Sequence, residues 1–149
     1  MSQGRAIAET LKGASSTGKI KKMDSIRSNC RRSPSQISSV ARYIIPLLRD
    51  SDAEVRMTAS KLVLEFSKLQ AKAIGSEAGR LIDILNKVFT KDHSDEELNW
   101  EPYANVMWAM GNISEKFPDI GAKCLNQMVR TLKYPIYHPE HPGDGLHLL

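Results

Sequence analysis

The segment from Ser33 to Gln70 alternates apolar and polar positions with the spacing of two consecutive helices. After a helix-entry sequence at 33–35, which provides a capping hydroxyl and a proline suited to a first turn, apolar residues recur every three or four positions. They are Ile37, Val40, Ala41, Ile44, Ile45 and Leu48. Pro46 removes one backbone donor from this run, so we expect a kink there. The polar residues 49–52 then end the pattern with cap and turn side chains.

A second helix is predicted directly after this turn, with Asp52 as its cap. Its apolar stripe comprises Val55, Ala59, Leu62, Val63, Phe66 and Leu69. Its opposite face carries Glu54, Thr58, Lys61, Glu65 and Lys68. Because only a few residues separate the two helices, they must fold back on each other as an antiparallel hairpin.

Weaker copies of this pattern lie on both sides of the hairpin. Upstream, two helices are expected over 5–13 and 19–32, joined by a turn rich in Ser and Gly at 13–18. Downstream, helices are expected from Ser76 or Glu77 to about 89, from 101 to Pro118 and over 120–133, with an acidic loop at 91–99. We therefore predict one all-α domain over residues 1–133. Residues 134–149, which are rich in Pro, Gly and His, are expected to form an irregular tail.

Two of these segments resemble HEAT repeats. Residues 46–59, P-L-L-R-D-S-D-A-E-V-R-M-T-A, contain the family's proline in the first helix, its Asp at the turn, and its Val-Arg and Ala early in the second helix. Residues 108–113, W-A-M-G-N-I, are similar to the end of a second helix in these repeats. Leu48 and Val88 occupy corresponding positions 40 residues apart, which fits the roughly 40–47-residue period of HEAT and armadillo arrays.

The resemblance implies a fold class: a short right-handed α-solenoid of about three HEAT-like helical hairpins plus one further helix. The third unit departs from the pattern by placing Pro102-Tyr103 where Val-Arg would stand, and the first unit lacks Val-Arg. An irregular bundle of the same helices is the alternative.

Composition and charge narrow the functional classes only a little. With 149 residues, 41% hydrophobic and 26% charged, the chain can bury a core, and this composition favours a folded chain over a wholly disordered one. No apolar stretch is long enough to cross a bilayer, so we expect an intracellular, cytoplasmic protein, with a nuclear location left open for a eukaryotic source. Cys30 and Cys124 lie far apart on predicted helices, where core filling is their default role.

The resemblance also implies a binding surface, because the second helices of HEAT arrays line the concave face. Trp108 shares its stripe with polar residues, so its indole should project from that face. The expected protein-binding residues are Trp108, Asn105, Asn112, Lys61 and Glu65. In the alternative, the preceding loop covers Trp108, with Trp100 taking part. Another protein is the expected partner, and the chain is expected to be a monomer or a weak homodimer.

A second candidate surface is basic. Lys19, Lys21, Lys22, Arg27, Arg31 and Arg32 crowd one predicted helix, with only Asp24 opposing them. Such density attracts nucleic acid or an acidic partner, and the candidate patch for either comprises Lys19, Lys21, Lys22, Arg31 and Arg32. Nucleic-acid binding through this patch is the alternative function. The run has no interleaved aromatic residues for base stacking, so a solvated helix face is the competing interpretation.

Catalysis and cofactors receive little support from the sequence. No nucleophile elbow, phosphate-binding glycine loop or zinc-protease helix is present. The acidic segment 92–101 lacks the ligand spacing of a calcium loop, and the His-rich tail lacks a second ligand pair on a rigid element. We therefore predict no enzyme, no metal and no cofactor. HEAT-like DNA glycosylases are a remote third possibility, matched here only by their ingredients.

Overall fold

The computed structural model describes residues 3–90, 99–123 and 126, and every regular element in that part of the chain is a helix. The prediction of an all-α protein is therefore confirmed. None of the described helices combines the length and the apolar character that crossing a bilayer requires.

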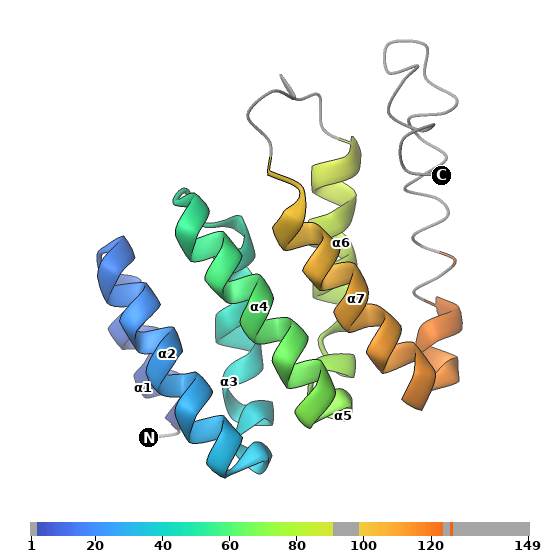
Figure 1. Cartoon of the computed structure of the whole chain (residues 1–149), viewed down its shortest axis with the longest axis horizontal. Coiled ribbons are helices and arrows are strands. Elements are labelled where there is room, and N and C mark those ends of the chain that lie inside the picture. The colour runs from blue at the N-terminus through green and yellow to red at the C-terminus, as the bar shows by residue number, and fades with distance from the viewer. Residues whose placement is uncertain (1–2, 91–98, 124–125, 127–149) are drawn as a thin grey trace.

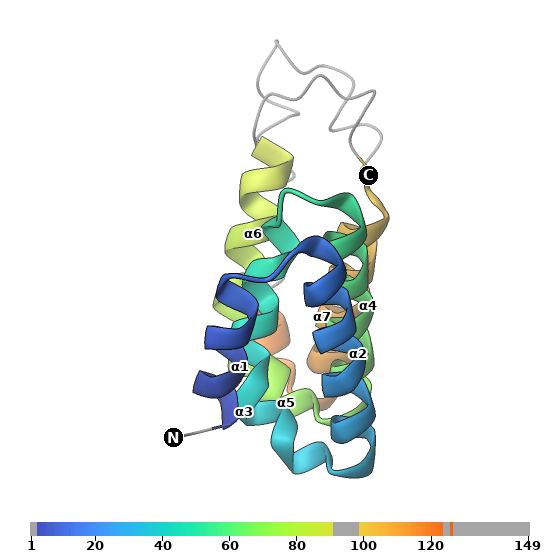
Figure 2. The same cartoon turned by 90° about the vertical axis from the view of Figure 1, so that its left-hand side faces the viewer.

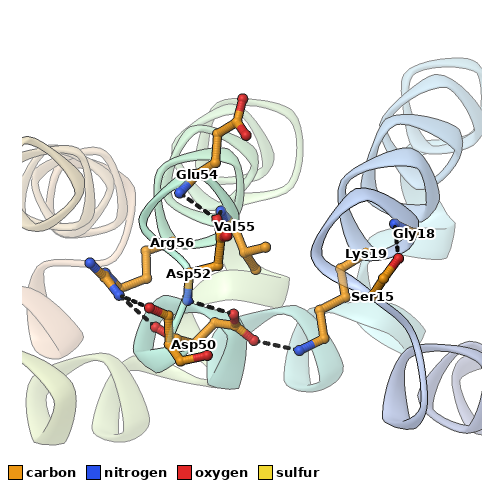
Figure 3. Close-up of polar contacts among 9 residues, drawn as sticks. Ser15, Gly18, Lys19, Asp50, Asp52, Glu54, Val55 and Arg56 are labelled. Atoms are coloured by element: carbon orange, nitrogen blue, oxygen red, sulfur yellow. Dashed lines mark hydrogen bonds and ion pairs between the residues drawn. The ribbon is translucent and has the colours of Figure 1, made fainter.

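The first two helices are α1 (Gln3–Lys12) and α2 (Ser16–Arg32). The predicted turn over 13–18 is wrong in its second half, because α2 already begins at Ser16. The hydroxyl of Ser15 accepts a hydrogen bond from the Gly18 N–H at 3.1 Å (Figure 3). This bond satisfies one of the free donors of the first helical turn, so the Ser and Gly residues that suggest a loop instead form a capped helix start.

The next segment comprises η1 (Pro34–Gln36), α3 (Ile37–Ile44) and η2 (Ile45–Arg49). The irregularity predicted at Pro46 takes the form of a change in helix type, since the α-helix ends at Ile44 and continues as a 3₁₀-helix. A proline near the start of a new helical segment has no donor to lose, which explains this position of the change. The six apolar residues of the predicted stripe are all buried.

Helix α4 (Ala53–Leu69) starts at the predicted cap. Asp52 Oδ1 accepts hydrogen bonds from the N–H groups of Glu54 at 2.8 Å and Val55 at 3.1 Å (Figure 3). A capping carboxylate satisfies two of the orphan donors and interacts favourably with the positive end of the helix dipole. The cap therefore determines where α4 begins.

Asp50 connects the same turn to α2. Its carboxylate accepts a hydrogen bond from Lys19 Nζ at 2.6 Å and another from the Asp52 N–H at 3.0 Å (Figure 3). The Arg56 guanidinium donates to the carbonyl oxygen of Asp50 at 2.7 Å. Burial alone would raise the pKa of the Asp50 carboxyl. The hydrogen bonds from Lys19 and from the Asp52 N–H, together with the charges of Lys19 and Arg56, lower that pKa below its ordinary value.

The second half of the fold contains α5 (Ala71–Gly75), α6 (Ala78–Thr90) and α7 (Glu101–Lys116). The short helix α5 was not predicted, because five residues are too few to show a helical period. A Cβ atom on Gly121 would lie 2.6 Å from the Cβ of Ser114, so the segment after α7 can pack tightly on it only with glycine at this position.

The last predicted helix is visible only in part. Residues 118–123 are helical, so the helix begins two residues earlier than predicted, directly at Pro118. Most of the predicted remainder up to 133, together with the acidic segment 91–98 and the tail 134–149, lies outside the described residues. The predicted domain boundary at 133 lies there too.

The helices form two layers around one core. Helices α2, α4 and α7 lie side by side and run in the same direction in one layer, and α1, α3 and α6 lie in the other (Figures 1 and 2). The core between the layers consists mainly of aliphatic side chains, together with Met23, Cys30, Phe66, Tyr103 and Met110. One face of α2, α4 and α7 therefore packs on the other layer, while the opposite face is open to solvent.

Asp50→Asn should lower the free energy of unfolding at pH 7 by about 1–3 kcal/mol, because the amide cannot pair with the charge of Lys19. The folded-state pKa of Asp50 is lowered, and the unfolded-state value is about 3.9. The carboxylate therefore stabilises the fold above the unfolded-state pKa, and this contribution disappears as the pH falls through the folded-state pKa. Urea unfolding at neutral and at acidic pH should show that the difference between wild type and variant shrinks on acidification. Asp83→Asn, at an exposed aspartate of α6, is the control; an equal loss in both variants would contradict the prediction.

Candidate partner-binding face

The solvent-exposed side of the α2/α4/α7 layer is called the α2–α4–α7 face here. Its exposed residues repeat at three-, four- and seven-residue intervals, opposite the buried stripes of the same helices. They are Lys21, Asp24, Ser28, Arg31 and Arg32 from α2, Glu54, Lys61 and Lys68 from α4, and Glu101, Ala104, Trp108, Gly111 and Glu115 from α7. Helical periodicity thus places the predicted protein-binding residues Trp108 and Lys61 on one face.

Trp108 is the most prominent apolar group on this face. Its exposed fraction is 62%, against 40% for Trp100. Its neighbours one turn away, Ala104 and Gly111, are small and exposed, so they leave the indole uncovered. Lys68 Nζ lies 5.4 Å from the centroid of the Trp108 ring, within the range of a cation–π interaction that links α4 to α7.

The other two predicted residues of α7 connect helices. Asn105 Nδ2 donates to Ser60 Oγ at 3.1 Å, and Asn112 Nδ2 donates to Ser67 Oγ at 3.0 Å. Both serines are fully buried, and each hydroxyl also donates to the backbone carbonyl three residues earlier. The two pairs are seven residues apart on both helices, so they hold α4 and α7 in one parallel register. The amide nitrogens of Asn105 and Asn112 are therefore engaged in the contact between α4 and α7, which is called the α4–α7 seam here.

Glu65 of α4 connects that helix to α2, and this contact is called the α2–α4 seam here. Its carboxylate pairs with Arg31, and it lies 3.4 Å from Nε of Arg27. The hydrogen bond from Arg31 to Glu65, reinforced by the carboxylate's charge, raises the pKa of the Arg31 guanidinium above its ordinary value. Two guanidinium groups share one carboxylate, so this seam keeps a positive charge.

The structure places part of the predicted nucleic-acid patch on the α2–α4–α7 face, where Lys21, Arg31 and Arg32 are exposed. Lys19 is paired with Asp50, Arg31 with Glu65, and the guanidinium of Arg32 donates to Asn29 Oδ1 at 2.7 Å. Lys21 is exposed on α2, whereas Lys22 lines a cleft on another side of the helix. Lys19 thus lies at the turn before α4, Arg31 in the α2–α4 seam and Lys22 in the cleft. Lys21 and Arg32 lie on the exposed surface of α2.

The cleft that Lys22 lines lies between α1, α2 and α3 and has a volume of about 140 Å³. Ile7, Ile26, Val40 and Cys30 provide its apolar lining. Cys30 is buried, as predicted, and that burial raises the pKa of its thiol, with a further contribution from the charge of Glu65. The raised pKa keeps this thiol protonated and unreactive at neutral pH.

Three residues of the two seams were missed by sequence reasoning as parts of the face. Ser60 and Ser67 look like small polar residues on an apolar stripe, and Arg27 looks like one more cation of the basic run. A signal for the serines exists, since Ser60/Ser67 and Asn105/Asn112 share the same seven-residue spacing. The signal for Arg27 requires the register between α2 and α4, which the sequence alone does not provide.

Neither a metal site in the described residues nor a similar known protein points to a function. The described residues include no group of three or more His, Cys, Asp or Glu side chains placed to hold a metal ion. The His-rich tail and most of the acidic segment, considered above for cation binding, lie outside these residues. Comparisons of the chain with protein-family models, curated proteins and solved structures find no match. The geometry of the α2–α4–α7 face is therefore the basis for assigning a function.

A double-mutant cycle should measure the coupling across the α4–α7 seam. Ser67→Ala and Asn112→Ala should each destabilise the fold, and the double variant should lose about 1 kcal/mol less than the sum of the two single losses, because both remove the same bond. Denaturant unfolding monitored by circular dichroism gives the four free energies. Ser28→Ala, at an exposed serine of α2, should have almost no effect. Full additivity of the two single losses would show that the bond does not contribute.

Gly111→Ala should stabilise the chain by about 0.5–1 kcal/mol, because alanine is the better helix former and the backbone of α7 accepts it. A Cβ atom at this position would meet nothing within 4 Å. Gly121→Ala is the matched comparison and should destabilise, since its Cβ would clash with the backbone and side chain of Ser114. Thermal unfolding of both variants checks the opposite signs; a destabilised Gly111→Ala would contradict the geometry.

Proposed function

We propose that the chain is a non-catalytic, HEAT-like binding module that acts as a scaffold by binding another protein through the α2–α4–α7 face. In this proposal the helices form a short right-handed α-solenoid with α2, α4 and α7 on its concave side. The parallel arrangement of these helices in one layer supports it (Figure 1). The offset of 45 residues between bonded positions of α4 and α7 also supports it, because HEAT arrays have a period of roughly 40–47 residues.

The exposure of Trp108 is the observation that carries this proposal. An indole that is 62% exposed leaves a large apolar area in water, and its burial by a partner would be favourable. The side chains around it are held in place, since Asn105 and Asn112 are bonded to α4 and Lys68 lies over the ring. A fixed aromatic group in a polar surround is the usual composition of an interaction hot spot.

Nucleic-acid binding through α2, the alternative from the sequence, gains no such support. Its five cations do not all lie on one surface, since Lys19 is paired with Asp50 and Lys22 lines the cleft between α1, α2 and α3. A HEAT-like glycosylase would depend on a similar basic surface. Protein binding therefore remains the function that this geometry favours.

Selection of displayed random peptides on the immobilised full chain tests the proposal. Enriched peptides should bind the wild-type chain, and Trp108→Ala should weaken their binding about 30-fold, which corresponds to a hot-spot loss of about 2 kcal/mol. Fluorescence polarisation with the labelled peptides gives the dissociation constants. Circular dichroism verifies that the variant keeps its helices, as expected for an exposed side chain.

Trp100→Ala is the matched control, because it removes the same side chain from the start of α7. Its effect on peptide binding should stay within about threefold, a free-energy change of less than 1 kcal/mol. Enriched peptides that bind equally well to the Trp108→Ala variant would refute a partner-binding role for this indole.

A further inference from the structure

The part of the face formed by α2 and α4 has an excess of positive charge. Six cationic side chains lie there: Lys21, Arg27, Arg31, Arg32, Lys61 and Lys68. Three carboxylates oppose them: Glu65 between Arg27 and Arg31, Asp24, which lies 4.0 Å from Arg27, and the exposed Glu54 of α4. Three positive charges therefore remain uncompensated on this part of the surface. Such an excess attracts a partner of opposite charge.

These charges are continuous with Trp108. Arg31 of α2 contacts Glu65 of α4, and Lys68 lies one turn further along α4 with its ammonium group over the Trp108 ring of α7. The exposed Lys61 is one turn before Glu65 on the same side of α4. A ligand that lies across the three helices would thus meet cations first and an apolar ring at the end.

Nucleic acid fits this order of groups poorly. Trp108 is the only aromatic residue among the exposed residues of the face, whereas strands are bound by successive stacking platforms. Glu101 and Glu115 are exposed on α7 seven residues to either side of Trp108 and would repel phosphates running along the helix. A peptide can place carboxylates over α2 and α4 and an apolar side chain over α7.

We infer that the α2–α4–α7 face binds an acidic, extended peptide segment of a partner protein, with carboxylates on Arg31, Lys61 and Lys68 and an apolar side chain on Trp108. The inference rests on the proposed function and adds the chemistry of the partner. Neighbouring helix axes lie about 8–10 Å apart, and an extended chain advances about 3.3 Å per residue. About six to eight residues therefore suffice to cross the three helices.

The test uses labelled peptides of about 12 residues, long enough to span this distance. One peptide contains Asp and Glu around two leucines, a second replaces the acids by Asn and Gln, and a third replaces them by Lys. An oligothymidylate of similar length is the nucleic-acid probe. Fluorescence polarisation with the full chain should show at least about tenfold tighter binding of the acidic peptide than of the neutral one, with weaker binding at higher salt.

Charge reversals locate the interaction. Lys61→Glu combined with Lys68→Glu should weaken binding of the acidic peptide at least about tenfold. Lys72→Glu combined with Lys87→Glu changes the net charge equally at exposed lysines of α5 and α6, outside the face, and should change binding less than about twofold. Glu65→Gln removes the carboxylate that Arg27 and Arg31 share, so it should tighten binding about threefold.

The outcomes separate this inference from the proposed function. Equal binding of acidic and neutral peptides, still lost in Trp108→Ala, would overturn the acidic partner and leave protein binding in place. Equal weakening by both lysine pairs would also overturn it, because the charge would then act without a defined site. Binding of oligothymidylate, with none of the peptides bound, would overturn the inference and the proposed function together.

Discussion

The geometry of the exposed face depends on the register between α4 and α7. Ser60 and Ser67 are fully buried; each hydroxyl donates to a carbonyl of its own helix and accepts a hydrogen bond from the amide of Asn105 or Asn112. Sliding α7 along α4 would break both bonds at once, because the two pairs share one seven-residue spacing. Trp108 lies between the two asparagines, and its position relative to Lys68 follows from this register.

The two seams of the α2/α4/α7 layer are built from different chemistry. The α4–α7 seam uses neutral amide and hydroxyl groups, whose bonds are insensitive to salt, whereas the α2–α4 seam uses two guanidinium groups and a carboxylate. Arg31 is largely exposed, so its ion pair contributes little to stability in water. Helix α2 is therefore fixed mainly by its buried residues Met23, Ile26 and Cys30 and by the Lys19–Asp50 pair. The charged residues of its open side remain available for contacts with other molecules.

Local signals in the sequence were sufficient for α3, η2 and α4 and for the cap of α4. The apolar period, Pro46 and Asp52 each act within one or two turns, so the pattern around them predicts α3, η2 and α4 closely. The predicted start of α2 differs from the observed one because Ser15 and Gly18 favour a loop and a capped helix alike. The partners of Glu65 and the roles of Ser60 and Ser67 depend on the packing of helices more than 30 residues apart, which no local pattern determines.

Two local rules are broken within one turn of α7. Trp108 exposes its indole to water. Gly111 lies in the interior of the helix, although only proline is a poorer helix former than glycine. Gly79 is equally open, but it lies in the first turn of α6, where a helix tolerates glycine more readily. Gly121 is required by its contact with Ser114, whereas no contact of the described fold requires Gly111. Violations that the fold does not compensate are expected at functional sites, and here both coincide on the face that carries the uncompensated charge.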